Sequence, residues 1–385
     1  MNNPIHSIWQ DIEDATAKHE IGGGVAIIQQ GGEVVLRKAT GWAIREPEDA
    51  RIPMKIDTIF DLASLTKVMV TAPATLQLIA DGKIGIDDPI STYIPEFGDE
   101  GQKHDVTIRN MLSHSSGIVS WRGVYTEGSG MKAYIDSLKA DQPEAAPNSQ
   151  VAYSCMGYIL LGEVIERVSG KRIDTYAHDH IFAPLGMNST MYTPPMELRN
   201  RIAATEDGNE YEVIAAINNP VQGWRDYLVH GEVHDGNAWY GLNGISGNAG
   251  LFGTADDMLT YARMWMNGGE LNGVRILPEE IVREATREQT GLAHPNQRRG
   301  LGWQMVPHEH PAKESMETAG AGLSMTAYGH TGFTGTSVWI DPERDLISIL
   351  FTNRVHPTVR GEWTGIRAGI SRQLADAYPI KQQVS

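Results

Sequence analysis

The chain has 385 residues, of which 41% are hydrophobic and 21% are charged, so a sizeable core is feasible and a disordered chain is not expected. The net charge is −16 with neutral histidines, and no basic run occurs, which argues against nucleic acid or a membrane surface as a partner. The single cysteine, Cys155, excludes an internal disulfide. No signal peptide and no apolar membrane span are visible, so we expect a soluble, cytoplasmic protein.

The first part of the chain predicts one helix followed by a β-hairpin. Residues 4–19 place several apolar side chains near one face of an amphipathic helix. Two strand-like runs, 25–30 and 33–40, are separated by Gly31 and Gly32. A glycine pair between apolar, β-branched runs is a strong hairpin signal.

The middle of the chain alternates helices with long polar, glycine-rich stretches. Buried or half-buried helices are predicted at 65–81 and 155–168, and amphipathic helices at 255–267 and 278–288. The polar stretches are 119–131, 204–250 and 289–328. We expect substrate specificity to reside within them, at 119–131, 204–248 and 289–328.

The C-terminal part again predicts a strand, a turn and a strand, at 336–340 and 346–353, followed by a helix at 363–378 that could cover the sheet. Strands at both ends with helices between them predict an α+β fold. We expect a discontinuous α/β domain with an antiparallel sheet, formed by 1–60 and 300–385, and a mainly helical domain, 61–299, that meets it at a cleft.

A Ser-x-x-Lys motif, Ser64 to Lys67, lies at the start of the predicted helix 65–81. Residues three apart are neighbours on one helix face, so the lysine amine can accept the serine proton if burial or a nearby cation lowers its pKa. The motif recurs at Ser129 and Lys132, in a glycine-rich loop with no buried helix starting at the serine. The apolar helix therefore favours Ser64 as the nucleophile.

Two other segments could supply catalytic groups. Tyr153 precedes the predicted helix 155–168, and its phenol could share a proton with Lys67 or pass one to a leaving group. The glycine-rich segment 329–335 precedes a strand and exposes main-chain N–H groups of the kind that form an oxyanion hole. On spacing alone, a packed ring and a turn into a hairpin are the more common explanations of the two segments.

Several other classes of site are disfavoured. Residues 244–248 fail the Gly-x-Ser-x-Gly pattern at the last position, which argues against an ordinary α/β-hydrolase. The histidine–carboxylate groups at 178–180, 234–235 and 308–310 are interpreted as solvated loops, the first and last with strand-like spacing, because no third metal ligand follows. No nucleotide-binding glycine motif occurs, so neither a metal nor another cofactor is expected.

Taken together, these motifs resemble those of the penicillin-binding and class C β-lactamase-like serine hydrolases, a family that includes Ser-x-x-Lys esterases, D-aminopeptidases and muropeptide amidases. The matching segments follow the family's order from about residue 22 to about residue 356; they are 60–70, 107–118, 153–171, 231–238, 249–258 and 329–354. The resemblance implies a central antiparallel sheet flanked by helices, together with an all-helical region. It also implies hydrolysis of an ester, amide or peptide of a small molecule.

By this resemblance, Ser64 is the acyl-accepting nucleophile, and Lys67 and Tyr153 handle its proton, with either as the base. His330, followed by Thr331 and Gly332, stands where many relatives carry the lysine of a Lys-Thr-Gly motif. By the same analogy, the N–H groups of Ser64 and Phe333 form the oxyanion hole, and Phe333, Thr331, Gly332 and Cys155 contact the substrate.

Cys155 departs from the family pattern, because it replaces the asparagine of a Tyr-x-Asn motif. A thiol is a weak donor and a weak acceptor, so efficient β-lactam turnover and strict peptide recognition are in doubt. Cys155 as the nucleophile is an alternative, although buried cysteines usually act as small hydrophobes. A β-lactamase, a D-alanyl-D-alanine carboxypeptidase and a catalytically silent binding protein on the same scaffold also fit these motifs. The oligomeric state is not predicted.

Overall fold

The computed structural model describes residues 4–98, 101–216, 223–291, 296–308, 319–359 and 364–380. Its main element is a seven-stranded antiparallel sheet in the order β3-β2-β1-β12-β11-β10-β9. The strands are β1 (Gly23–Gln30), β2 (Glu33–Ile44), β3 (Ile52–Pro53), β9 (Gln304–Met305), β10 (Tyr328–Thr331), β11 (Ser337–Asp341) and β12 (Leu346–Thr352). The two ends of the chain therefore pair through β1 and β12, which confirms the predicted α+β fold.

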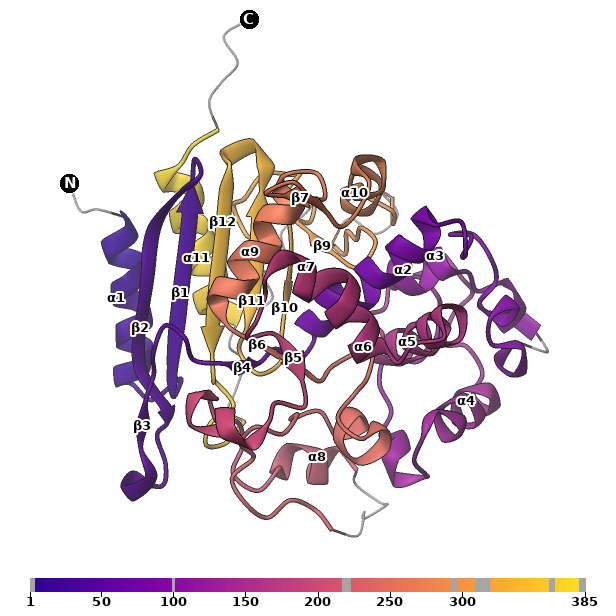
Figure 1. The fold of residues 1–385 in the computed structure, drawn as a ribbon, viewed down its shortest axis with the longest axis horizontal. Coiled ribbons are helices and arrows are strands. Elements are labelled where there is room, and N and C mark those ends of the chain that lie inside the picture. The colour runs from indigo at the N-terminus through magenta and orange to yellow at the C-terminus, as the bar shows by residue number, and fades with distance from the viewer. Residues whose placement is uncertain are drawn as a thin grey trace, which may run out of the picture.

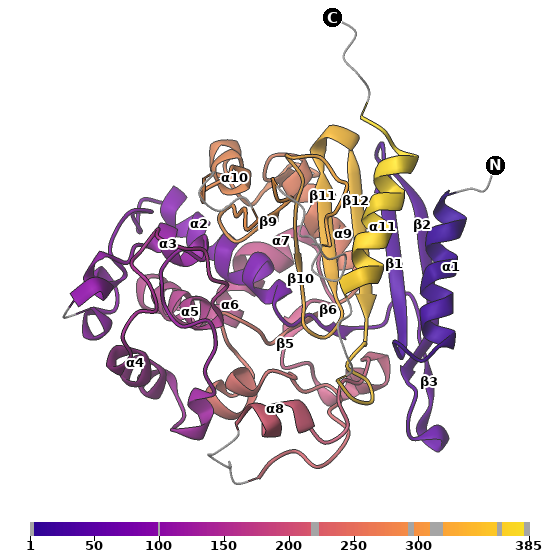
Figure 2. The same cartoon turned by 180° about the vertical axis from the view of Figure 1, so that it is seen from behind.

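Helices cover both faces of this sheet (Figure 1, and Figure 2 from behind). Successive side chains of a strand point to opposite faces, and on β1 Val25 and Ile27 join one buried cluster while Ala26 and Ile28 join another. The first cluster includes side chains of α9 (Ala255–Met266), and the second includes side chains of α1 (Pro4–Ala17) and α11 (Thr364–Ala377). Burial on both faces explains why the middle of β1, residues 25–28, and most of β12 are apolar.

The local predictions for both ends of the chain are confirmed. The predicted helices at 4–19 and 363–378 are α1 and α11, and the predicted strands are β1, β2, β11 and β12. The first hairpin turns at Gly31 and Gly32, whose φ angles are 60° and 79°. Positive φ at both turn residues is what a tight two-residue hairpin requires, and glycine adopts it without steric cost.

The second half of the molecule is mainly helical. The predicted helix at 65–81 consists of a wide π-helical turn, Lys67–Thr71, followed by α2 (Ala72–Ala80), and the predictions at 155–168 and 278–288 correspond to α5 (Cys155–Ser169) and α10 (Glu279–Thr286). The other helices are α3 (Ile108–Leu112), α4 (Met131–Ala140), α6 (Ile173–Ala177), α7 (Ala183–Leu185) and α8 (Glu210–Ala215). A small sheet in the order β4-β6-β5 joins β4 (Phe60–Asp61), β6 (Leu251–Gly253) and β5 (Met191–Tyr192), and β7 (Glu270–Leu271) pairs with β8 (Val274–Arg275).

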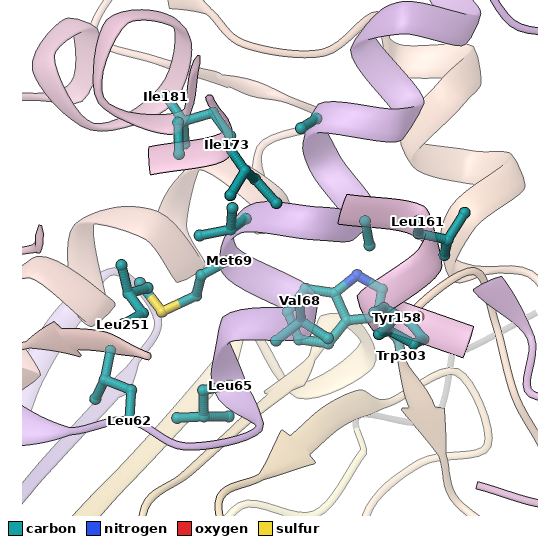
Figure 3. Close-up of a cluster of buried hydrophobic side chains, with 14 of the residues drawn as sticks. Leu62, Leu65, Val68, Met69, Tyr158, Leu161, Ile173, Ile181, Leu251 and Trp303 are labelled. Atoms are coloured by element: carbon teal, nitrogen blue, oxygen red, sulfur yellow. The ribbon is translucent and has the colours of Figure 1, made fainter. Parts of the chain in front are cut away.

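A buried apolar cluster packs around the start of the segment that leads into α2 (Figure 3). Leu65 and Val68 are fully buried there, together with Tyr158 of α5 and Trp303. Each fully buried aliphatic side chain contributes about 1.5–3 kcal/mol to folding. The cluster therefore fixes the segment that carries Ser64 and Lys67 against α5.

The same core extends from Val25 in the sheet to Tyr134 in α4. Helix α9 belongs to residues 61–299 in sequence, yet it packs against β1 and β12. The division into 1–60 with 300–385 and 61–299 stays a prediction. Across the described ranges, no helix is both long enough and apolar enough to cross a bilayer.

Candidate active site

Ser64 lies in a tight turn between β4 and the helical segment that starts at Leu65. Ala63, directly before it, has a φ of 46°, a left-handed conformation that is strained for alanine. The turn is fixed from both sides, because Asp61 Oδ1 accepts the Ala63 N–H at 2.8 Å and Thr66 Oγ1 donates to the Ala63 carbonyl at 2.7 Å. The half-buried Ser64 is thus held in one orientation.

Lys67 is fully buried beneath Ser64. Its Nζ donates to Ser64 Oγ at 3.0 Å, to the Asn248 carbonyl at 3.0 Å and to Cys155 Sγ at 3.5 Å, one acceptor for each N–H of an ammonium. Burial by itself lowers the pKa of Lys67, but Cys155 and Tyr153 raise it, and the resulting pKa lies above the ordinary value. For Lys67 to accept the Ser64 proton, its pKa was expected to be lowered. That expectation is not met in the free protein.

Tyr153 stands over Lys67, with Nζ 4.9 Å from the ring centroid. Its buried hydroxyl makes no hydrogen bond of normal geometry with the described residues. Burial raises the pKa of Tyr153, and Lys67 and Ser64 only partly oppose that rise. At neutral pH the free protein thus holds a protonated phenol beside a protonated lysine.

His114, which received no role from the sequence, holds the segment that carries Tyr153. Its Nδ1 accepts the Ser154 N–H at 3.0 Å, and its carbonyl accepts the Ala152 N–H at 2.9 Å. Its ring centroid lies 4.6 Å from that of Tyr153, and burial keeps the pKa of His114 well below its ordinary value. The neutral imidazole therefore positions Tyr153. In the sequence, only its place in segment 107–118, which resembles the family, pointed to His114.

His330 lies on β10, with its ring centroid 5.8 Å from that of Tyr153. Its Nδ1 donates to the Thr331 carbonyl at 2.8 Å, which leaves Nε2 as a buried acceptor without a partner among the described residues. Burial, with Arg299 and Lys67 adding to it, places the pKa of His330 well below its ordinary value. His330 thus differs from the lysine of related motifs in being uncharged.

The loop after β10 packs directly on the Ser64 turn. Thr334 Oγ1 donates to the Asp61 carbonyl at 2.7 Å, and a Cβ on Gly332 would lie 2.5 Å from the Leu62 carbonyl oxygen. The Phe333 carbonyl is held by Arg354 Nε at 2.7 Å. Within the described part of the chain, the N–H groups of Ser64 and Phe333 donate to no main-chain carbonyl, which suits the predicted oxyanion hole.

A cavity of about 420 Å³ opens at Ser64. Its lining includes most of the predicted site residues, namely Ser64, Tyr153, Cys155, His330, Thr331 and Phe333, while Lys67 lies buried below. Sequence reasoning assigned no binding role to the others, which are Ala63, Trp121, Tyr211, Glu212, His234, Asp235, Ala249, Arg299 and Gln304. Apart from Ala63 and Ala249, these residues come from the three polar stretches in which specificity was expected.

The interpretation of residues 234–235 as a solvated loop is wrong. His234 is 2% exposed, its Nε2 lies 2.9 Å from Glu206 Oε2, and its N–H donates to Asp61 Oδ2 at 2.7 Å. The Glu206 partner is distant in sequence, so local spacing carried no signal for this pair. The pair instead supports one wall of the cavity.

The described residues of the other histidine groups form no metal site. Residues 178–180 are exposed, as expected, but they lie in a π-helical turn, His178–Phe182, and not in a strand-like loop. Of 308–310 only His308 is described, with its Nε2 3.1 Å from Glu288. Among the described residues, no group of three or more histidine, cysteine or carboxylate side chains is arranged to hold a metal ion.

The two alternative nucleophiles are less favourably placed. Ser129 is exposed, and Lys132 is an exposed residue that pairs with Asp136 instead of a serine. Cys155 lines the cavity, but burial raises the pKa of its thiol, and only the thiolate is a strong nucleophile.

Comparisons with known proteins show the family to which the chain belongs. A sequence model of the β-lactamase family matches residues 9–369. The chain is 31% identical to an N-acetylmuramyl-L-alanine amidase of Bacillus subtilis (strain 168), covering 88% of this chain and 78% of the relative. It is also 31% identical to a putative D-alanyl-D-alanine carboxypeptidase of Escherichia coli (strain K12), covering 86% and 78%.

Among solved structures, EstCE1, described as a hydrolase with promiscuous acyltransferase activity, superposes with a TM-score of 0.72 over 97% of this chain and 98% of that one. Its sequence identity is 20%, so this likeness concerns the fold alone. The family match spans the whole site, from the Ser64 turn to the β10 loop. The chain belongs to the β-lactamase family and is a β-lactamase-like serine hydrolase.

Proposed function

We propose that this protein cleaves an amide or ester bond of a small, peptide-like molecule through an acyl-enzyme on Ser64. The observation that carries the proposal is the 3.0 Å contact between Lys67 Nζ and Ser64 Oγ at the floor of a cavity. A nucleophile and a proton-handling group within hydrogen-bond distance are what covalent catalysis requires.

In the first half of the reaction, Ser64 Oγ attacks the substrate carbonyl carbon, and its proton passes to the Lys67–Tyr153 pair. The carbonyl oxygen becomes an oxyanion, which accepts hydrogen bonds from the N–H groups of Ser64 and Phe333. The bond to the leaving group then breaks as the pair returns the proton to it. Water hydrolyses the acyl-serine in the same manner and releases the acid.

In the free protein, neither Lys67 nor Tyr153 is deprotonated and ready to act as the base. Lys67 and Tyr153 both have raised pKa values, so both keep their protons near neutral pH. One proton must leave the pair before Ser64 can be deprotonated, and the pair then acts as a coupled unit. Either partner can supply the base.

The relatives favour an amide substrate related to peptidoglycan fragments, since one is named for an N-acetylmuramyl-L-alanine bond and another for a D-alanyl-D-alanine bond. Esterase activity toward activated esters accompanies such a site, because the ester carbonyl meets the same nucleophile. A β-lactamase is the second candidate, favoured by the family match, but the Cys155 thiol replaces the amide that commonly recognises the substrate in that family. The partners proposed are thus small molecules.

A fluorophosphonate probe tests the nucleophile. We expect the wild-type protein and Ser129→Ala to be labelled on Ser64, as located by peptide mass mapping, and Ser64→Ala to remain unlabelled. Labelling of Ser64→Ala to the wild-type extent would overturn the proposal. Turnover of phenyl acetate by wild type but not by Ser64→Ala distinguishes an enzyme from a silent binding protein on the same scaffold.

A further inference from the structure

We propose that Arg367 is a positioning residue of the oxyanion hole, whose guanidinium binds the Gly332 carbonyl and thereby orients and strengthens the Phe333 N–H. This inference rests on the proposed function and deepens it, because it assigns a role in the same site to a charged residue that does not line the cavity.

The Gly332 carbonyl and the Phe333 N–H belong to one peptide group. In a trans peptide the C=O and N–H bonds point in opposite directions, so a group that fixes the carbonyl also fixes the direction of the N–H. Arg367 Nη2 donates to the Gly332 carbonyl at 3.2 Å. Phe333 lines the cavity, and its N–H donates to no main-chain carbonyl of the described residues. Arg367 thus holds one end of the peptide group whose other end is available to an oxyanion.

The loop does not need Arg367 in order to keep its shape. The Gly332 carbonyl also accepts the Gly335 N–H at 3.1 Å, and the Gly332 N–H donates to the Thr336 carbonyl at 2.7 Å. The guanidinium therefore adds a charge to a turn that main-chain hydrogen bonds already close. A carbonyl that accepts from a cation is polarised, and the N–H of the same peptide group becomes a stronger donor.

Arg354 fixes the next peptide group in the same manner. Its Nε donates to the Phe333 carbonyl at 2.7 Å, and its guanidinium carbon lies 4.7 Å from the centroid of the Phe333 ring. Arginine carries a permanent charge, so two cations bind the carbonyls on either side of the Phe333 α-carbon. Fixed positive charge close to the point where an oxyanion develops stabilises the transition state without reorganisation.

The buried position of Arg367 is costly for folding. This residue of α11 is 8% exposed, and its Nε is buried without a hydrogen-bond partner among the described residues. Burial, with the charge of Arg354 adding to it, lowers the pKa of Arg367 to about 9, so the guanidinium is still protonated at neutral pH. No carboxylate of the described residues offsets this charge. A buried cation of this kind reduces stability, which agrees with a role in catalysis and not in folding.

Replacing Arg367 by methionine tests the inference, because methionine keeps an unbranched side chain and removes the charge. We expect kcat for phenyl acetate to fall about five- to tenfold, less than the 10²- to 10³-fold for loss of an oxyanion donor itself. KM stays within about twofold of wild type, since the oxyanion forms in both halves of the reaction. Arg367→Lys recovers part of kcat, because lysine keeps the charge. Tm of Arg367→Met does not fall, since an uncompensated buried charge is removed.

The Ki of phenylboronic acid gives a second measurement. Its boron becomes tetrahedral when it binds the Ser64 oxygen, which places a boron-bound oxygen in the oxyanion hole. Binding of such a transition-state analogue depends on the same hydrogen bonds as the oxyanion does. We therefore expect Ki to rise in Arg367→Met by about the factor by which kcat falls.

Arg344→Met is the matched control. The Arg344 side chain is 9% exposed, it donates to the Tyr378 carbonyl at 2.9 Å, and it pairs with Asp341 at 2.9 Å, at the end of β11 away from the catalytic loop. Because this variant leaves the buried Asp341 carboxylate without its partner, we expect Tm to fall while kcat and Ki stay at the wild-type values.

The inference is overturned if Arg367→Met keeps the wild-type kcat and Ki. It is also overturned if the loss of activity comes with a fall in Tm like that of Arg344→Met, or if Arg367→Lys is no more active than Arg367→Met. If Ser64→Ala hydrolyses phenyl acetate as well as wild type does, the proposed function fails instead.

Discussion

Lys67 Nζ lies 3.0 Å from Ser64 Oγ, and both residues belong to one short segment that is clamped between Asp61 and the apolar cluster around Val68. The contact places a proton-handling group against a candidate nucleophile before any substrate arrives. Pre-organised contacts of this kind reduce the entropy that must be lost in the transition state. Single substitutions can test each component of this arrangement separately.

Replacing Lys67 by methionine removes the group that handles the Ser64 proton. We expect kcat for phenyl acetate to fall by about 10²- to 10⁴-fold, the range that general acid–base catalysis contributes. Lys132→Met is the control, because Lys132 occupies the second Ser-x-x-Lys match on the surface, and it retains wild-type kcat. Loss of activity in both variants would contradict the assignment of Lys67.

The pH dependence of kcat/KM follows from the coupled pair. The active base is the deprotonated form, and the pKa values of Lys67 and Tyr153 are raised, so kcat/KM increases as the pH is raised from about 6 to about 9. Subtraction of the rate measured with Ser64→Ala removes the background hydrolysis of the ester. Because the pKa of His330 lies well below its ordinary value, His330→Asn leaves the shape of this profile unchanged. An inflection near neutral pH that this substitution abolishes would make His330 the base.

Substitution of Gly332 tests whether the loop after β10 contributes to the oxyanion hole. In Gly332→Ala the new Cβ would lie 2.5 Å from the Leu62 carbonyl oxygen, so the loop must shift and carry the Phe333 N–H away from Ser64. We expect kcat to fall by about 10²- to 10³-fold, as on loss of one oxyanion donor. Gly369→Ala on α11 is the control, since its Cβ meets nothing within 4 Å, and it keeps wild-type kcat. Equal kcat in the two variants would exclude this role of the loop.

Alkylation and substitution of Cys155 test whether its side chain is an ordinary buried thiol or a nucleophile. Burial raises the pKa of its thiol, so we expect iodoacetamide to modify it slowly at neutral pH and Cys155→Ser to retain hydrolysis of phenyl acetate. Cys155→Asn restores an amide where the thiol stands, and we expect it to hydrolyse nitrocefin faster than wild type does. Complete inactivation of Cys155→Ser with normal labelling of Ser64 would require a direct catalytic role for the sulfur.

The structural features predicted best from the sequence are those that depend on residues close together in the chain. Helix α1 and the β1–β2 hairpin were predicted because apolar periodicity and a glycine pair are local signals. The pairing of β4 with β6 was not predicted, because those strands are two or three residues long and lie far apart in the chain. The same distinction explains why α9 was identified as a helix while its packing on the sheet was not.

For the site, the spacing of Ser64 and Lys67 was informative because three residues is a local distance on a helix. The structure brings Tyr153, Cys155 and His330 to the same cavity, and only the family resemblance connected those segments. Arg299 carried no signal, since a basic residue in a polar stretch ordinarily faces solvent. Only the folded chain places it in the lining of the cavity.

The most direct test of the central claim is detection of the acyl-enzyme. Phenyl acetate is mixed with the protein, the reaction is quenched in acid during the first turnover, and peptides are mapped by mass spectrometry. The account predicts one acetyl group on Ser64 in wild type, and none on that peptide in Ser64→Ala. An acetyl group found on Cys155 or Ser129 instead, or turnover without any acylated residue, would contradict it.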